Sequence, residues 1–257
     1  MDINNQQYSP GGFSRLPPVV KNLLIINFLF FVATIAFQRF WGIDLKETLG
    51  LHYFESERFH PYQIFTYMFM HANFSHILFN MFALWMFGAV IENYWGGKRF
   101  LVYYLITGIG AGLVQEAVYG IRIYQIISQL TPDMVYIVKN EGLNLLLQNK
   151  NYSFPLMGNL NLLLNTGTVG ASGSVFGLLL AFGMMFPNSL IYLYFLFPIK
   201  AKWFVIGYGA IELWQGIANQ SGDNVAHFAH LGGMLFGIIL ILLWRKKEKN
   251  PYDYYEY

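Results

Sequence analysis

The 257-residue sequence contains no cysteine and few charged residues. Without cysteine the chain cannot form a disulfide framework, a thiolate metal site or a cysteine nucleophile. Charged residues make up 12% of the chain, against roughly 25% in soluble domains. The net charge of +2 comes from 16 basic and 14 acidic residues that are scattered along the chain, whereas a nucleic-acid partner requires a clustered basic face. These shortages exclude an ordinary soluble protein and a nucleic-acid partner.

Long apolar runs take the place of the missing charge. Apolar residues make up 55% of the chain, and several runs approach the ~20 residues that a helix needs to cross a bilayer. The stretch 190–199 is apolar but too short to span, so we interpret it as the end of the fourth helix or as an interfacial piece. We predict an all-α, polytopic membrane helix bundle with six transmembrane helices, at residues 23–37, 76–91, 100–119, 169–186, 203–217 and 225–244.

The distribution of Lys and Arg orients this bundle, because these residues resist translocation in short loops. The membrane domain is predicted over 21–245, with a short segment, 1–20, before it and a tail, 246–257, after it. The Tyr-rich end of this tail is interpreted as interfacial or disordered. With both termini in the cytoplasm, the inner segments hold ten of the 16 basic residues, and the other six are spread over much longer outer loops. We therefore predict that both termini are cytoplasmic and that membrane lipid surrounds the bundle.

Two outer connections are too long to be simple turns. Residues 38–67 are rich in aromatic side chains, which suits a segment lying in the outer membrane interface. Residues 120–165 contain two prolines and an amphipathic pattern over 133–148 that is too polar to span. Both connections are predicted to be external insertions.

Polar side chains inside membrane helices are costly, so they indicate function by default. His71 and His76 lie at the outer start of the second predicted helix, and His227 and His230 lie at the outer start of the sixth. Asn80 follows His76 by four residues, so both side chains share one helix face. Helices two, four and six all enter from the outside, and the fourth begins with residues 170–174, GASGS. A serine, two or more histidines and an asparagine are therefore expected at similar depth.

Glycine spacing predicts how these helices meet. Gly173 and Gly177 on the fourth helix, and Gly233 and Gly237 on the sixth, follow the small-xxx-small pattern that lets backbones approach closely in lipid. His230 lies three residues before Gly233 and shares its face. If the two glycine faces pack together, Ser172 and the imidazole of His230 lie close to each other at the outer end of the contact.

Several other chemistries lack the residues that they require. The zinc-protease pattern HExxH, a pair of aspartates within the apolar runs, the hydrolase pattern G-x-S-x-G and a Walker A loop are all missing. A metal-binding transporter could use the four helix-end histidines, since imidazole suits zinc or copper, but no carboxylate or thiolate accompanies them in the sequence. What remains is a serine nucleophile with a histidine base and no evident carboxylate as third member.

With these motifs the chain resembles a rhomboid intramembrane serine protease. The GxSG of that family corresponds to residues 170–173, its HxxxN to 76–80 and its AHxxGxxxG to 229–237. Two further stretches agree, PYQIFTYMFMH at 61–71 and ENYWGGKRF at 92–100. The resemblance covers about 61–244 except for 120–165, and the lack of a seventh apolar run suggests the six-helix bacterial form.

The resemblance implies a role for each matching residue. Ser172 is the nucleophile and His230 the general base, while the Ser172 backbone N–H, the Asn80 amide and His76 hold the oxyanion. Phe176 occupies a position where an aromatic ring packs against the base. No cofactor and no metal are expected. His71 is a structural or water-retaining residue, and the role of His227 stays open.

The implied function is endopeptidase cleavage in or next to transmembrane segments of membrane proteins, carried out by a Ser–His dyad in a bacterial cytoplasmic membrane. The alternative is a catalytically inactive rhomboid-like protein that binds and escorts membrane clients, although such relatives typically lack the serine or the histidine. The insertion 120–165 could cap the active site, contact a substrate or be neutral.

Overall fold

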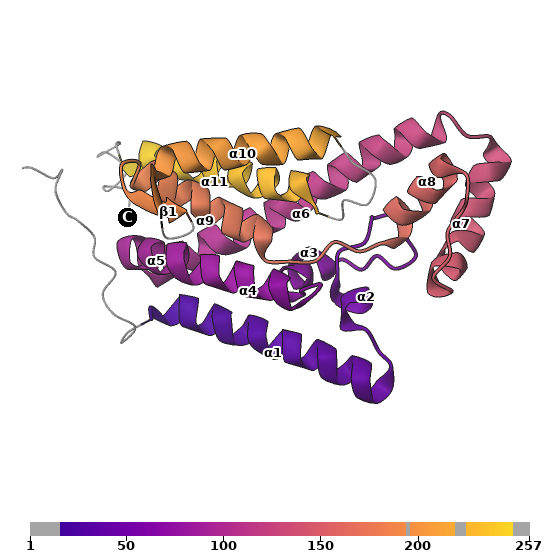
Figure 1. Ribbon diagram of the computed structural model, residues 1–257, viewed down its shortest axis with the longest axis horizontal. Helices are drawn as coiled ribbons and strands as arrows, with labels where there is room; N and C mark the ends of the chain where they lie inside the picture. The colour runs from indigo at the N-terminus through magenta and orange to yellow at the C-terminus, as the bar shows by residue number, and fades with distance from the viewer. Residues whose placement is uncertain (1–15, 194–195, 219–224, 249–257) are drawn as a thin grey trace, which may run out of the picture.

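The computed structural model describes residues 16–193, 196–218 and 225–248. Most of the predicted N-terminal segment, the link between the fifth and sixth predicted helices and the Tyr-rich tail lie outside these residues. The described chain is mostly helical and forms an elongated bundle (Figure 1). The start of the first helix (Pro18–Trp41) and the end of the last helix (His227–Glu248) lie at the same end of this bundle.

Four helical segments of the described chain are long and apolar enough to cross a membrane. They are α1 (Pro18–Trp41), the continuous helix Phe74–Trp95, α6 (Gly97–Ile127) and the apolar part, His227–Lys246, of α11 (His227–Glu248). The helix Phe74–Trp95 consists of α4 (Phe74–Ala83), a π-helical turn, η3 (Leu84–Gly88), and α5 (Ala89–Trp95). These four segments contain three of the six predicted runs in full and the fourth, 225–244, from residue 227 onward.

The other two predicted runs form shorter helices. α9 (Ser172–Met185) has 14 residues, which at ~1.5 Å per residue is shorter than the ~30 Å hydrocarbon core of a bilayer. α10 (Ala201–Ala218) has 18 residues and carries a buried glutamate, Glu212. All six predicted runs are therefore helical over most of their described residues, and the number of transmembrane spans remains a prediction.

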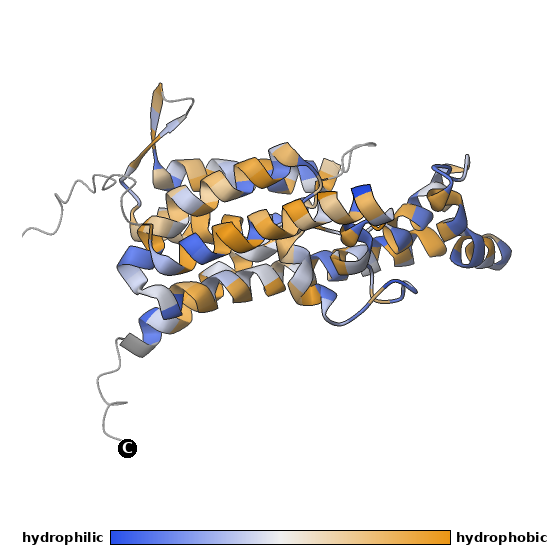
Figure 2. Cartoon of the chain, turned by 90° about the horizontal axis from the view of Figure 1, so that it is seen from below, coloured by the Kyte–Doolittle hydropathy of each residue, from blue (hydrophilic) through white to orange (hydrophobic). Residues whose placement is uncertain are grey.

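The stretch between α9 and α10 departs from the predicted all-α class. β1 (Leu190–Leu193) and β2 (Phe197–Lys200) pair antiparallel, with Leu190 opposite Lys200. Pro187 lies two residues after the end of α9, next to its C-cap Phe186, and lacks the N–H that a continuing helix needs. The interpretation of 190–199 as a helix end was therefore wrong. The hairpin projects from the bundle (Figure 2), and its place in a membrane interface stays a prediction.

α9 lies at the centre of the bundle and packs against α6, α10 and α11. The predicted approach of α9 to α11 is confirmed at one glycine pair, because a Cβ on Gly233 would overlap the carbonyl oxygen of Gly173. Gly177 instead faces α6, where a Cβ would lie 2.7 Å from Thr107 Cβ. Gly237 packs on Tyr103 of α6 and on α9. The prediction that both glycine pairs form one α9–α11 contact was therefore wrong for Gly177. Glycines at i and i+4 show that a helix face can be approached closely, but they do not identify the helix that packs there.

The insertion 120–165 forms a helical unit beyond the end of the bundle (Figure 1). α6 continues to Ile127, because no proline interrupts it before Pro132, and α7 (Pro132–Leu147) and α8 (Pro155–Asn165) follow. The predicted amphipathic helix over 133–148 is confirmed as α7. These helices share a small apolar core with the segment before α4, made by Tyr53, Ile123, Val138, Met157, Leu160 and Leu164.

Candidate active site

The structure brings together the serine and the histidine that the motifs single out. Ser172 begins α9, and His230 lies one turn inside α11. Ser172 Oγ lies 2.9 Å from His230 Nε2, a distance typical of a hydrogen bond. The His230 ring stacks on Phe176, with ring centroids 4.1 Å apart and planes 6° from parallel. The predicted proximity of the serine and the base is confirmed, and the ring of Phe176 fixes the plane of the imidazole.

A glycine in an unusual conformation places Ser172 next to a second histidine. Gly170 has φ +132°, which side-chain-bearing residues rarely adopt. A Cβ at Gly170 would lie 2.8 Å from Nε2 of His76 and 3.5 Å from Ser172 Oγ. The imidazole of His76 and the hydroxyl of Ser172 therefore border the same small space.

His76 is suited to donate a hydrogen bond into that space. Asn73 caps α4 by accepting from the His76 backbone N–H at 2.9 Å, and His76 Nδ1 accepts from the Ala72 N–H at 3.3 Å. A neutral imidazole that accepts at one ring nitrogen carries its proton on the other, so Nε2–H is the donor near Ser172. Asn80, the other predicted oxyanion residue, is buried and uses one amide N–H on the carbonyl of His76, at 2.9 Å.

The first turn of α9 supplies further donors. The first N–H groups of a helix have no partner within the helix, and the positive end of the helix dipole favours a nearby negative charge. The N–H of Ser172 belongs to this turn. The site thus offers backbone and imidazole N–H groups beside the nucleophile.

A carboxylate that the sequence analysis did not identify completes the cluster. Glu212 Oε2 on α10 lies 2.8 Å from His230 Nδ1 and 2.7 Å from His227 Nδ1. Glu212 is only 4% exposed. The interpretation that the histidine base has no carboxylate as third member was therefore wrong. A signal was present, because Glu212 is the only acidic residue within the apolar run 203–217, and ionisable groups in membrane helices mark function by default.

Among the described residues, the side chains of Glu212, His227 and His230 form a group that could hold a metal ion. Their ligand atoms all lie within 4.8 Å of one another, so the interpretation that no carboxylate accompanies the histidines was wrong. The Oε2–Nδ1 distances of 2.7 and 2.8 Å match hydrogen bonds. His71 and His76, the other two predicted metal candidates, are not members of this group.

His71 lies behind the site in the turn before α4. Its ring centroid is 5.2 Å from that of His76, and its side chain is buried. Burial, followed by the neighbouring His76, lowers the pKa of His71 to about 4. His71 is therefore neutral at neutral pH and adds no charge beside the oxyanion donors.

The segment that leads into α9 is held by the insertion 38–67. Leu51 and Thr168 exchange two backbone hydrogen bonds, at 2.9 and 2.7 Å. Two residues later the Gly170 N–H donates to the carbonyl of Tyr67 at 2.9 Å. The turn that carries Ser172 is thus fixed from outside the bundle.

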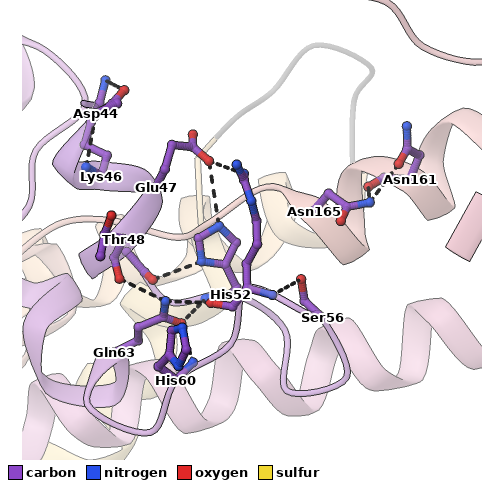
Figure 3. A network of polar contacts seen from close by, with 12 residues as sticks. Asp44, Lys46, Glu47, Thr48, His52, Ser56, His60, Gln63, Asn161 and Asn165 are labelled. Carbon is purple, nitrogen blue, oxygen red and sulfur yellow. Dashed lines mark hydrogen bonds and ion pairs between the residues drawn. The ribbon is translucent and has the colours of Figure 1, made fainter. Parts of the chain in front are cut away.

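A buried glutamine organises this outer segment (Figure 3). Gln63 Nε2 donates to the carbonyls of Arg58 and Thr48, at 2.8 and 3.1 Å, and Gln63 Oε1 accepts from the backbone N–H groups of His60 and His52, at 3.2 and 3.3 Å. The His52 side chain is fully buried, and this burial lowers its pKa. A neutral His52 ring packs beside Gly167, where a Cβ would come within 3.0 Å of it. The network links α2 (Leu45–Leu49) to α3 (Gln63–Thr66), and the 3-10 turn η2 (Tyr67–Phe69) follows α3 directly.

Comparison with known proteins identifies the family. A family model described as the Rhomboid domain matches residues 58–123 and 136–247, more than half of the chain. "Rhomboid-like protein 11, chloroplastic" of Arabidopsis thaliana is 30% identical over 200 residues, which are 75% of this chain and 55% of that protein. "RHOMBOID-like protein 12, mitochondrial" of the same plant is 25% identical over 239 residues, 92% of this chain and 60% of that protein.

A shorter match reaches a bacterial protease. "Rhomboid protease GlpG" of Salmonella newport is 34% identical over 59 residues, 23% of this chain and 21% of that protein. The chain spans less than two thirds of the length of the two plant relatives. The family model nevertheless covers both the GxSG segment and the histidines of α11. The chain belongs to the rhomboid family and is a multi-pass membrane protein.

Proposed function

We propose that this chain is an intramembrane serine endopeptidase that hydrolyses peptide bonds in or next to transmembrane segments of membrane proteins. The observation that carries this proposal is the 2.9 Å contact between Ser172 Oγ and His230 Nε2 at the start of α9. A nucleophile within hydrogen-bond reach of a base, with that base oriented by a third group, is the arrangement that activates a serine.

In the proposed reaction, Ser172 Oγ attacks the substrate carbonyl while His230 Nε2 takes the hydroxyl proton. The negative charge that develops on the carbonyl oxygen is held by the Ser172 N–H, by His76 Nε2–H and by Asn80. Each such donor contributes roughly 3 to 4 kcal/mol to the transition state. His230 then gives the proton to the leaving amine, and water, activated by the same base, releases the acyl group.

The proposal extends to the arrangement in the membrane. Six spans with both termini in the cytoplasm agree with the excess of Lys and Arg on the inner side. They also agree with the start of α1 and the end of α11, which lie at one end of the bundle. The membrane domain then runs over 21–245, with 38–67 and 120–165 outside. A bacterial cytoplasmic membrane fits the six-helix form, and cell fractionation distinguishes it from the organelle membranes that the names of the plant relatives indicate.

The test is labelling of the detergent-solubilised protein with a fluorophosphonate probe, which reacts with a serine that a base has activated. We expect labelling of the wild type and its loss in Ser172→Ala and His230→Ala. Ser174→Ala is the matched control, because Ser174 Oγ lies two residues away and donates to the Tyr104 carbonyl at 2.7 Å; it should label as the wild type does. Cleavage of a model transmembrane substrate should follow the same order.

Two results would contradict the proposal. Labelling of Ser172→Ala at the wild-type rate would place the reactive group elsewhere. A wild type that keeps its helical content and cooperative unfolding but neither labels nor cleaves would favour the alternative function, binding and escort of membrane clients.

A further inference from the structure

Glu212 contacts the candidate site but has no role in the proposed reaction of Ser172 and His230. Its carboxylate lies on α10, 18 residues before His230 in the sequence, and is buried against the first turn of α11. One oxygen, Oε2, is within hydrogen-bond distance of Nδ1 of both His227 and His230. The same His230 ring reaches Ser172 with its other nitrogen.

These contacts determine which protons the imidazoles carry. A carboxylate only accepts hydrogen bonds, so each Nδ1 that faces it is a donor. With its proton on Nδ1, a neutral His230 presents a lone pair on Nε2, and this lone pair accepts the proton of the Ser172 hydroxyl. Glu212, which contacts the ring nitrogen that faces away from Ser172, thus sets the tautomer that general-base action requires.

The carboxylate also matters for the charge that appears during the reaction. When His230 takes the serine proton it becomes positive, and a buried negative group 2.8 Å away attracts that charge more strongly than the same group would across bulk water. A buried carboxylate in turn needs donors of its own. His227 supplies the second donor, which accounts for a histidine one turn before the base.

We propose that Glu212 is a positioning residue that holds His230 in the tautomer and orientation needed to activate Ser172, and that His227 anchors the Glu212 carboxylate. The inference rests on the proposed function, and it replaces the Ser–His dyad by a Ser–His–Glu arrangement in which α10 contributes to the site.

Two substitutions separate this role from simple packing. Glu212→Gln keeps the shape of the side chain but removes the charge. Glu212→Asp keeps the charge but shortens the side chain by one methylene. A positioning role predicts that Asp retains more activity than Gln, whereas a packing role predicts the reverse order.

The experiment measures the rate of fluorophosphonate labelling of the full-length protein against probe concentration. We expect Glu212→Gln to lower the maximal rate by ~10²- to 10⁴-fold, the range spanned by losing one preorganised electrostatic contact and by losing the carboxylate of a serine triad. The probe concentration for half-maximal rate should change little, because Glu212 faces the base and not the probe. Glu212→Asp should recover part of the rate, and His227→Asn should lower it less than Glu212→Gln does.

The outcomes are distinguishable from failure of the proposed function. Loss of labelling in Ser172→Ala with a normal Glu212→Gln rate would leave the peptidase proposal in place and overturn the positioning role. A Glu212→Gln rate above that of Glu212→Asp, with parallel losses of thermal stability, would assign Glu212 to packing. A wild-type rate that changes after chelator washing and returns with added zinc would overturn the hydrogen-bonded arrangement in favour of a metal held by Glu212, His227 and His230.

Discussion

At the scale of single residues, the site depends on one glycine whose backbone no other residue adopts easily. Gly170 combines φ +132° with a position where a Cβ would come within 2.8 Å of the His76 ring. Backbone strain of this kind costs about 1 to 3 kcal/mol, and the added methyl group also pushes on a predicted oxyanion donor.

We therefore expect Gly170→Ala to lower the fluorophosphonate labelling rate by about tenfold or more, since each 1.4 kcal/mol in the barrier is a factor of about ten. Gly207→Ala on α10 is the control, because a Cβ there meets nothing within 4 Å, and alanine favours a helix by roughly 0.5 to 1 kcal/mol. Equal labelling rates for the two variants would show that the Gly170 conformation is not needed.

Residue patterns in the sequence identified part of this site. Ser172, His230 and His76 stand in short local motifs, and each motif lies within a single stretch of fewer than ten residues. Glu212 stands alone on another helix, so its partnership with His227 and His230 depends on how α10 packs against α11. Such a contact between distant helices is a property of tertiary packing that local spacing does not contain.

At the scale of elements, the first helix begins at a carboxylate from another part of the chain. Pro17 precedes α1 and offers no side-chain cap. Glu92 on α5 accepts hydrogen bonds from the N–H groups of Val19 and Val20, at 2.9 and 2.7 Å, and is 3% exposed. A negative group at a helix N-terminus satisfies free N–H groups and interacts favourably with the helix dipole.

Glu92→Gln should lower the free energy of unfolding by about 1 to 2 kcal/mol, the usual effect of losing a helix cap. Chemical denaturation in detergent micelles, followed by circular dichroism, measures the change. Glu55→Gln is the matched control, because Glu55 pairs with Lys139 at the surface and exposed ion pairs contribute about 0 to 1 kcal/mol. If both variants unfold at the same denaturant concentration, Glu92 does not anchor α1.

The elements themselves were predictable to different degrees. Long apolar runs and proline positions located α1, α6, α7 and α11. These signals can be read from the sequence because each depends only on residues that are close together along the chain. The sequence does not predict the hairpin at 190–199, since a short apolar run does not distinguish strand from helix. Only its pairing, Leu190 with Lys200, makes it a hairpin.

At the scale of the whole molecule, the stability of the fold depends on two histidines that are buried in the neutral form. His52 and His71 both lie outside the helices that are long enough to span. Burial lowers the pKa of each, that of His71 to about 4 from an ordinary value of 6.5. Between these values the unfolded chain binds a proton at His71 that the folded chain does not bind. The free energy of unfolding must therefore fall as the pH decreases through this interval.

This linkage predicts that the stability of the protein is sensitive to acid through His71 and His52. From about pH 6.5 down to about pH 4, His71 alone should remove roughly 3 kcal/mol of stability, since one pKa unit corresponds to about 1.4 kcal/mol. His71→Phe keeps a ring in place but cannot be protonated, so its unfolding free energy should fall less over the same interval. Adding His52→Asn should flatten the pH dependence further. Denaturation series at pH 7, 5.5 and 4 measure these slopes, and a double variant with the wild-type slope would show that acid acts on other groups in the bundle.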